Sequence, residues 1–172
     1  MKLPILIHPD PRLKKETEAL SDSSDALRAL GQDMLDTMYA APGIGLAGPQ
    51  VAQLKQIIVL DCHKQDEEPP RPLVMLNPQV IASSDELNTY EEGCLSIPDQ
   101  FADVTRPKEV EVEWMDLDGR AQKETFDGLW ATCVQHEIDH LHGKLFIDYL
   151  KPLKRQMITR KMVKLKKERA RG

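Results

Sequence analysis

Two histidines and a glutamate near residue 140 form the pattern in this sequence that is best suited to chemistry. His136 and His140 are four residues apart, and Glu137 directly follows the first, which makes an H-E-x-x-H arrangement. Residues four apart in an α-helix lie one turn above another, so the two imidazoles point at a common position. Glu137 projects about 100° away from His136, beside that position rather than onto it. Two neutral nitrogen ligands and a carboxylate that can handle the proton of a coordinated water predict a metal site.

The residues around this motif predict a helix that runs through the protein interior between Gly128 and Gly143. Two of its faces carry apolar side chains at helical spacing. One face holds Leu129, Cys133, His136 and His140, and the other holds Trp130, Val134, Ile138 and Leu141. Asp139 is expected to orient a metal ligand rather than to bind metal itself. A buried helix can also carry histidines that only bond to the backbone, so the motif alone leaves a structural role open.

A catalytic metal site of this kind needs a third protein ligand, and Cys94 is the candidate. It follows Gly93 in a turn-like segment, residues 91–98, between expected strands. A thiolate here would complete a Cys-His-His set and leave the fourth position open for water. The other cysteines, Cys62 and Cys133, have the sequence context of buried, inert thiols.

Length and composition predict a single soluble domain over residues 1–172. Hydrophobic residues make up 41% of the chain and charged residues 30%, which is ordinary for a globular protein. No apolar run approaches the roughly 20 residues that cross a bilayer, and the apolar N-terminal stretch is too short for a signal peptide. Three cysteines, an odd and sparse number, favour a reducing cytosol. The sequence therefore predicts a cytoplasmic protein without membrane contact.

Hydrophobic periodicity predicts an α+β fold, with mostly antiparallel strands packed around the buried helix and a further helix at the C-terminus. An amphipathic helix is expected at residues 25–39, after an irregular segment that contains three prolines. Strands are expected at residues 56–61, 73–76, 77–83, 109–115 and 121–126. Apolar residues alternate with glutamates in 109–115, and Asp118-Gly119 predicts a hairpin turn into the following strand.

Residues 41–50 contain three glycines and two prolines, which exclude a helix interior and favour a loop. The backbone of such a loop can approach a ligand closely. A phosphate-binding loop is disfavoured because no Lys-Ser/Thr pair follows and no strand immediately precedes it. A nucleotide is therefore not an expected ligand.

Three stretches together resemble the signature motifs of the peptide deformylases. They are residues 43–50 (GIGLAGPQ), 92–96 (EGCLS) and 135–140 (QHEIDH), in the expected order and separation. The resemblance extends over nearly the whole chain and is to the bacterial, Gram-negative type with a C-terminal helix. It implies an enzyme that removes the formyl group from the N-terminal formyl-methionine of nascent polypeptides.

The resemblance also implies a chemical role for each residue that matches the motifs. The metal ligands would be Cys94, His136 and His140. Glu137 would be the general acid/base, and Gln50 with the backbone N–H of Leu95 would bind the oxyanion. The implied physiological ion is Fe²⁺, one per chain, which Zn²⁺, Ni²⁺ or Co²⁺ can replace, since sulfur and imidazole ligands suit all of them.

Substrate contacts follow from the same resemblance. Gly43 and Gly45 would lie along the substrate backbone, with an apolar slot for the methionine side chain lined by Ile44, Leu129 and Cys133. Glu92 and Arg106 would form an ion pair that stiffens the metal-binding loop. Without the resemblance, both residues would be interpreted as solvated surface charges.

Three positions depart from the usual motifs. Gly48 stands where the first motif usually has alanine, Phe101 where some bacterial members have arginine, and Thr132 where an aliphatic residue is frequent. These departures leave side-chain preference open and leave the expected reaction unchanged.

The C-terminal segment carries a charge opposite to that of the rest of the chain. Residues 151–172 contain ten Lys or Arg and one acidic residue, so they carry +9 while residues 1–150 carry −14. This pattern predicts a basic helix that belongs to the same domain. It can be a docked helix with a solvated face, or it can contact RNA phosphates. The resemblance implies contact with the ribosome, and DNA is not an expected partner.

Two alternative functions remain open at this point. A zinc metalloprotease shares the H-E-x-x-H motif but usually takes a third ligand downstream, where this sequence offers nothing suitable. An inactive, ribosome-binding relative would be expected to lack one of four residues, all of which are present: Cys94, His136, Glu137 and His140.

Overall fold

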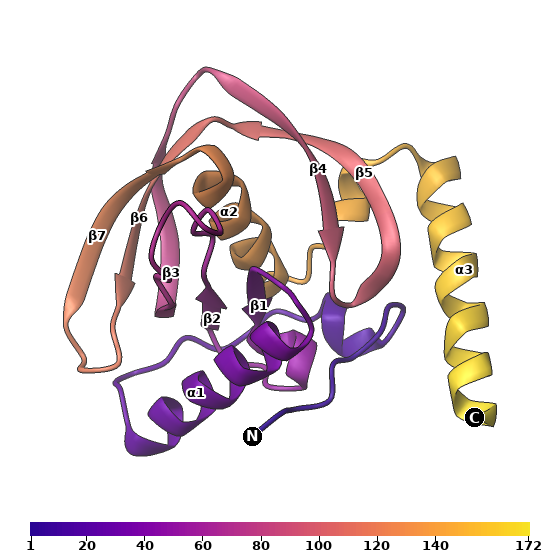
Figure 1. Ribbon diagram of the computed structural model, residues 1–172, viewed down its shortest axis with the longest axis horizontal. Helices are drawn as coiled ribbons and strands as arrows, with labels where there is room; N and C mark the ends of the chain where they lie inside the picture. The colour runs from indigo at the N-terminus through magenta and orange to yellow at the C-terminus, as the bar shows by residue number, and fades with distance from the viewer.

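A five-stranded sheet, a two-stranded sheet and three α-helices make up the protein in the computed structural model, which covers residues 1–172 (Figure 1). The larger sheet is antiparallel throughout, in the order β1-β2-β3-β6-β7. Its strands are β1 (Gly45–Ala47), β2 (Ile57–Leu60), β3 (Leu73–Ser83), β6 (Glu109–Met115) and β7 (Ala121–Asp127). The smaller sheet pairs β4 (Leu87–Cys94) with β5 (Ile97–Pro107). The predicted α+β class is confirmed.

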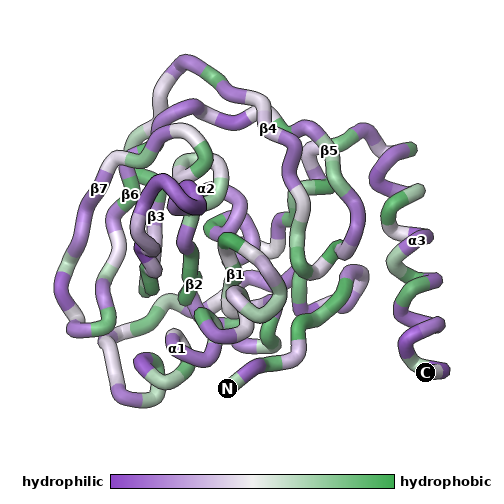
Figure 2. Tube along the Cα trace, viewed as in Figure 1, coloured by the Kyte–Doolittle hydropathy of each residue, from purple (hydrophilic) through white to green (hydrophobic).

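Helix α2 (Gly128–Leu141) is the interior helix that the sequence predicted around the H-E-x-x-H motif. It passes between the larger sheet and the β4–β5 pair (Figure 1). Val134 and Leu141 are fully buried in one apolar cluster with Leu60 of β2 and Val112 of β6, and β2 stands out as a hydrophobic stretch in Figure 2. Because the helix is enclosed on several sides, its polar side chains are held out of bulk water as well.

Helix α1 (Asp25–Ala40) covers the β1–β2 end of the larger sheet (Figure 1). The Ser24 hydroxyl caps it by accepting a hydrogen bond from the Leu27 N–H at 3.1 Å. Met34 and Met38 are fully buried against the sheet. The predicted helix at residues 25–39 is thus confirmed to within one residue.

The β6–β7 hairpin follows the predicted alternation. Val110, Val112 and Trp114 are buried, and Gly119 takes a left-handed φ of 80° in the turn that leads to β7. Strand pairing runs in register from Glu109↔Asp127 to Met115↔Ala121. The alternation of apolar and polar residues predicted this hairpin correctly because one face of it is buried and the other is open to solvent.

The β4–β5 hairpin was not predicted, and residues 91–98 are strand for most of their length rather than a turn between strands. Only Leu95 and Ser96 lie between the two strands. The inward face of β4 carries Asn88, Tyr90 and Glu92, so neither face shows the apolar alternation on which strand prediction relies.

Two smaller differences concern β3 and the glycine-rich segment. Strand β3 is continuous over the two strands expected at 73–76 and 77–83, with a bulge at Asn77, which has a φ of 51°. The Asn77 side chain exchanges hydrogen bonds of 2.7 Å with the backbone of Leu20, which holds the bulge in place. Residues 41–50 are not wholly loop, because they contain β1 and part of a 3₁₀ turn, η2 (Gly48–Val51).

Helix α3 (Pro152–Arg171) lies at one side of the molecule next to β5 (Figure 1). It docks through Ile158 and Met162, which are buried in a cluster with Ile97 and with Phe146 of the short turn η3 (Phe146–Tyr149). The rest of the helix is mainly hydrophilic in Figure 2. No helix in the structure has the length and apolar character needed to cross a bilayer.

We expect Ile158→Ala to destabilise the protein by about 2–5 kcal/mol, because it leaves a cavity under α3. Leu153→Ala on the same helix is the matched control, since Leu153 is 72% exposed and its truncation should change stability by less than about 0.5 kcal/mol. Urea unfolding of both variants measures the difference. Equal losses would contradict the docked position of α3.

Candidate metal centre

Cys94, His136 and His140 converge on one point in the interior. One potential ligand atom from each residue lies within 4.8 Å of those of the other two, and Cys94 Sγ is 3.4 Å from His140 Nε2. Cys94 comes from the end of β4 and the histidines from consecutive turns of α2. The set predicted from sequence is therefore assembled, although its members come from elements more than forty residues apart.

The buried carboxylate of Glu92 determines how His136 is presented. Burial by itself would raise the pKa of Glu92, but hydrogen bonds from Arg106 and His136 outweigh it and lower the pKa. An ionised carboxylate can only accept, so His136 Nδ1 donates its proton to Glu92 Oε1 at 2.9 Å. This fixes the tautomer and leaves Nε2 free to bind a metal. Burial lowers the pKa of His140, which favours the neutral form that a ligand needs.

Glu92 and Arg106 form a bidentate ion pair with distances of 2.7 and 2.9 Å. Both residues are at most 5% exposed, so interpreting them as surface charges without the resemblance would have been wrong. Asp139 accepts a hydrogen bond from the other side of the same guanidinium at 2.8 Å. It therefore reaches His136 only through Arg106 and Glu92, and does not contact a histidine of the cluster.

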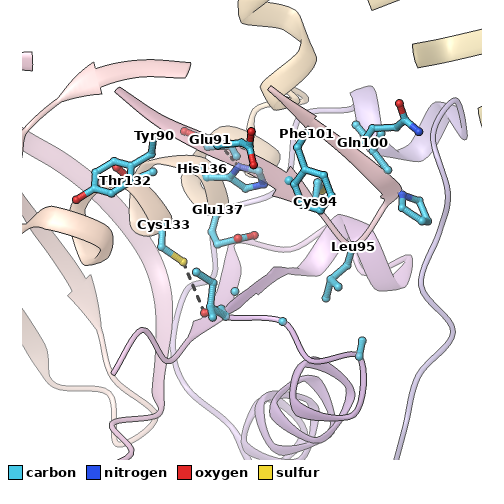
Figure 3. Close-up of a pocket in the computed structure, with 18 of the residues that line it drawn as sticks. Tyr90, Glu91, Cys94, Leu95, Gln100, Phe101, Thr132, Cys133, His136 and Glu137 are labelled. Atoms are coloured by element: carbon cyan, nitrogen blue, oxygen red, sulfur yellow. Dashed lines mark hydrogen bonds and ion pairs between the residues drawn. The ribbon is translucent and has the colours of Figure 1, made fainter. Parts of the chain in front are cut away.

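Glu137 lies beside the cluster, as its position in the motif predicted (Figure 3). It is 4% exposed, and its Oε1 atom has no hydrogen-bond partner within the protein. Burial raises the pKa of Glu137 to about 7. A carboxyl group in this state can both take and give a proton near neutral pH.

The Gln50 side chain also points at this centre. Its Oε1 accepts a hydrogen bond from the Ala47 N–H at 2.9 Å, which turns the amide nitrogen toward Cys94 Sγ at 3.4 Å and Ser96 Oγ at 3.1 Å. Ser96 is fully buried and was not singled out from the sequence, although it belongs to the EGCLS stretch. Leu95 lies in the turn between Cys94 and Ser96. The Gln50 amide and the backbone of Leu95 are therefore both next to the Cys94 sulfur.

Gly48 explains one departure from the usual motif. A Cβ on this residue would lie 2.5 Å from the Gln53 carbonyl oxygen and 2.9 Å from that of Lys55. These are backbone atoms that cannot easily move, so the turn that presents Gln50 requires glycine at this position in this chain.

A cavity of about 490 Å³ opens next to the centre (Figure 3). Its walls include every residue predicted to contact substrate: Gly43, Ile44, Gly45, Leu129 and Cys133. Thr132 lines it as well, and Phe101 lies at its mouth with 59% of its surface exposed. Phe101 packs over Gly93, where a Cβ would lie 2.6 Å from the aromatic ring.

The two remaining cysteines hold one wall of this cavity. Cys133 Sγ and Cys62 Sγ both donate toward the Ile44 carbonyl oxygen, at 3.6 and 3.8 Å, and the Asp61 N–H donates to the same oxygen at 2.9 Å. Both thiols are buried, as predicted, and Cys133 in addition faces the cavity.

Comparison with known proteins identifies the family. The sequence profile described as "Polypeptide deformylase" matches residues 2–156. The chain is 50% identical over 167 residues to the peptide deformylase of Brucella suis, covering 97% of this chain and 95% of that protein. It is also 50% identical over 166 residues to the peptide deformylase of Rhizobium meliloti, covering 96% and 95%.

Solved structures give the same result for the fold. The peptide deformylase of Ehrlichia chaffeensis superposes with a TM-score of 0.94 at 33% identity, covering 99% of both chains. That of Legionella pneumophila superposes with a TM-score of 0.90 at 41% identity, covering 100% of this chain and 99% of the other.

The fold and the Cys-His-His cluster beside a buried glutamate define a hydrolase with the donor set of a metal centre. The chain belongs to the peptide deformylase family, whose members remove N-formyl groups from nascent formyl-methionyl polypeptides and depend on a metal ion. The resemblance in the three motifs is thereby confirmed over almost the full chain, and the metalloprotease alternative is set aside.

We expect Gly45→Ala to lower the rate of deformylation by about 100-fold, the size of effect that a misplaced reacting group can have. A Cβ at this position would lie 2.9 Å from Cys133 Sγ and would collide with Glu137 Oε2. Gly31→Ala is the matched control, because Gly31 lies on α1 outside the cavity and its Cβ would meet only the side chains of Val74 and Leu117. Formate release from a formyl-Met peptide measures both, and equal losses would contradict this role for the Gly45 position.

Proposed function

We propose that this enzyme hydrolyses the formyl group of N-terminal formyl-methionine through Glu137 and a metal ion held by Cys94, His136 and His140. The convergence of these three ligand atoms beside Glu137, at the end of a substrate-sized cavity, is the observation that carries the proposal. The products are formate and a free amino terminus.

The donor set fits a catalytic metal ion. One thiolate and two imidazoles suit Fe²⁺, Zn²⁺, Ni²⁺ and Co²⁺, and three protein ligands leave a position open. We propose Fe²⁺ as the physiological ion, on the resemblance of the motifs, with the others able to replace it. A bound ion of this kind lowers the pKa of a coordinated water toward neutrality.

The protein's own side chains then manage the proton and the developing charge. Glu137 takes the proton of the attacking water and passes it to the departing amine nitrogen, a role that its pKa of about 7 supports. The Gln50 amide and the Leu95 backbone N–H donate to the formyl oxygen as it becomes negative. Loss of one such donor typically costs about 10²–10³ in rate.

The open edge of β1 offers a place for the substrate backbone. Strand β1 is at the end of the larger sheet and pairs only with β2. A peptide that adds along residues 43–45 would hydrogen-bond to the backbone whatever its sequence. The methionine side chain would enter the apolar part of the cavity between Ile44, Leu129 and Cys133. This arrangement suits an enzyme that must accept many different nascent chains.

We expect Glu137→Ala to lower formate release from formyl-Met-Ala-Ser by about 10²–10⁴-fold, because the general acid/base is lost. Metal content, measured by elemental analysis, should stay at one ion per chain, since Glu137 is not a proposed ligand. Activity close to that of the parent protein, assayed without oxygen and with Fe²⁺ supplied, would contradict the assignment.

We further propose that α3 contacts the ribosome, in the cytoplasm where nascent chains emerge. Residues 151–172, which contain the helix, carry +9, and the exposed side of the helix includes Leu153 and Met157 as well as Lys and Arg. Such a surface suits RNA phosphates with adjacent apolar contacts.

Replacing exposed Lys161 and Lys164 with glutamate should weaken co-sedimentation with ribosomes at least tenfold at low salt. Lys64→Glu reverses a charge on an exposed loop outside α3, so this variant should co-sediment with ribosomes as the parent protein does. Deformylation of a short peptide is expected to stay the same in both. Unchanged ribosome binding in the double variant would show that α3 is only a solvated helix.

A further inference from the structure

A continuous series of polar contacts runs from His136 to the protein surface. His136 Nδ1 donates to Glu92 at 2.9 Å, and Glu92 accepts two hydrogen bonds from Arg106. Arg106 Nη1 donates to Asp139 Oδ2 at 2.8 Å, and the Tyr149 hydroxyl donates to the same oxygen at 2.7 Å. Glu92 and Arg106 are buried, whereas the Asp139 side chain is 23% exposed and Tyr149 is 41% exposed.

Arg106 is therefore shared between two carboxylates. If its full charge were directed at Glu92, that carboxylate would be a weaker acceptor for the His136 proton. Asp139 draws part of the guanidinium charge away, so Glu92 stays basic enough to hold the His136 N–H strongly. A strongly held N–H makes the opposite ring nitrogen a better metal donor, and it prevents the ring from rotating.

Tyr149 keeps Asp139 in this position. Its hydroxyl donates to Asp139 Oδ2 and also accepts a hydrogen bond from Arg106 Nη1 at 3.3 Å. Its ring centre lies 4.7 Å from the Arg106 guanidinium and 4.0 Å from Lys144 Nζ. Without the hydroxyl, the partly exposed carboxylate of Asp139 could turn to water and leave Arg106. Tyr149 closes the short turn η3, only three residues before α3 begins at Pro152.

We propose that Asp139 and Tyr149 are positioning residues for the metal ligand His136, acting through Arg106 and Glu92. Neither residue lines the cavity, and neither side chain has a hydrogen bond to a residue of the cluster, so their effect is on how firmly a metal ion is retained. This inference rests on the metal centre proposed above.

The test measures the rate at which Zn²⁺ leaves the fully loaded protein to an excess of a coloured chelator. Asp139→Asn keeps the shape and an acceptor oxygen but removes the charge, and we expect release about 10–100-fold faster, the usual effect of losing an outer partner of a ligand. Tyr149→Phe keeps the ring over Arg106 and removes only the hydroxyl, so a smaller acceleration of a few fold is expected.

Tyr39→Phe provides a matched control. The Tyr39 hydroxyl donates to Asp61 at 2.6 Å, so it makes the same type of bond, yet no contact joins this pair to the cluster. This variant should lose some stability in urea and leave Zn²⁺ release unchanged. The visible spectrum of the Co²⁺-loaded protein should change in Asp139→Asn and stay the same in Tyr39→Phe.

The double variant of Asp139 and Tyr149 decides whether the two act as one unit. If Tyr149 works only by holding Asp139, the double variant should release Zn²⁺ no faster than Asp139→Asn alone. If the double variant releases Zn²⁺ by the product of the two single accelerations, Tyr149 does not act through Asp139. If Asp139→Asn releases Zn²⁺ at the rate of the parent protein, the inference is wrong. If the parent protein fails to bind one Zn²⁺ per chain, the proposed metal centre fails instead.

Discussion

The structure depends on the burial of titratable groups around a single helix. Helix α2 places His136, Glu137 and His140 where water is largely excluded, and such groups are costly unless they are paired. For His136 this partner is Glu92, which accepts its Nδ1 proton and is itself paired with Arg106. A buried pair of this kind contributes little net stability, but removing one partner typically costs about 3–5 kcal/mol because it leaves the other charge unpaired. Its value here is positional, since it orients a ligand.

The same enclosure gives two nearby carboxylates different states. Glu92 receives hydrogen bonds from Arg106 and His136 and remains ionised, whereas Glu137 has one oxygen without a partner and its pKa rises to about 7. One carboxylate thus serves as a fixed acceptor and the other can exchange a proton. Environment rather than residue type separates the two roles.

The β4–β5 hairpin and the glycine-rich segment complete the centre from outside the helix. The β4–β5 turn delivers Cys94, and the turn after β1 delivers Gln50, whose amide is oriented by the Ala47 N–H. Strand β1 leaves one edge of the sheet open next to the cavity. Substrate recognition and metal binding therefore depend on the position of the backbone. Close packing fixes that position at Gly45 and Gly48, where no space is left for a Cβ atom.

The amino-acid sequence by itself determined the elements whose patterns are local. The period of α2, the alternation in β6 and the amphipathic pattern of α1 are each set by neighbours a few residues away, and the three motifs carried the candidate ligands. Only the tertiary structure decided what depends on distant partners. Strand β4 lacks an apolar pattern, and Arg106 becomes a buried residue only when β5 packs against α2. Ser96 and Tyr149 meet their partners only after the chain has folded. Burial and pairing across such separations are properties of the packed molecule, and no local pattern encodes them.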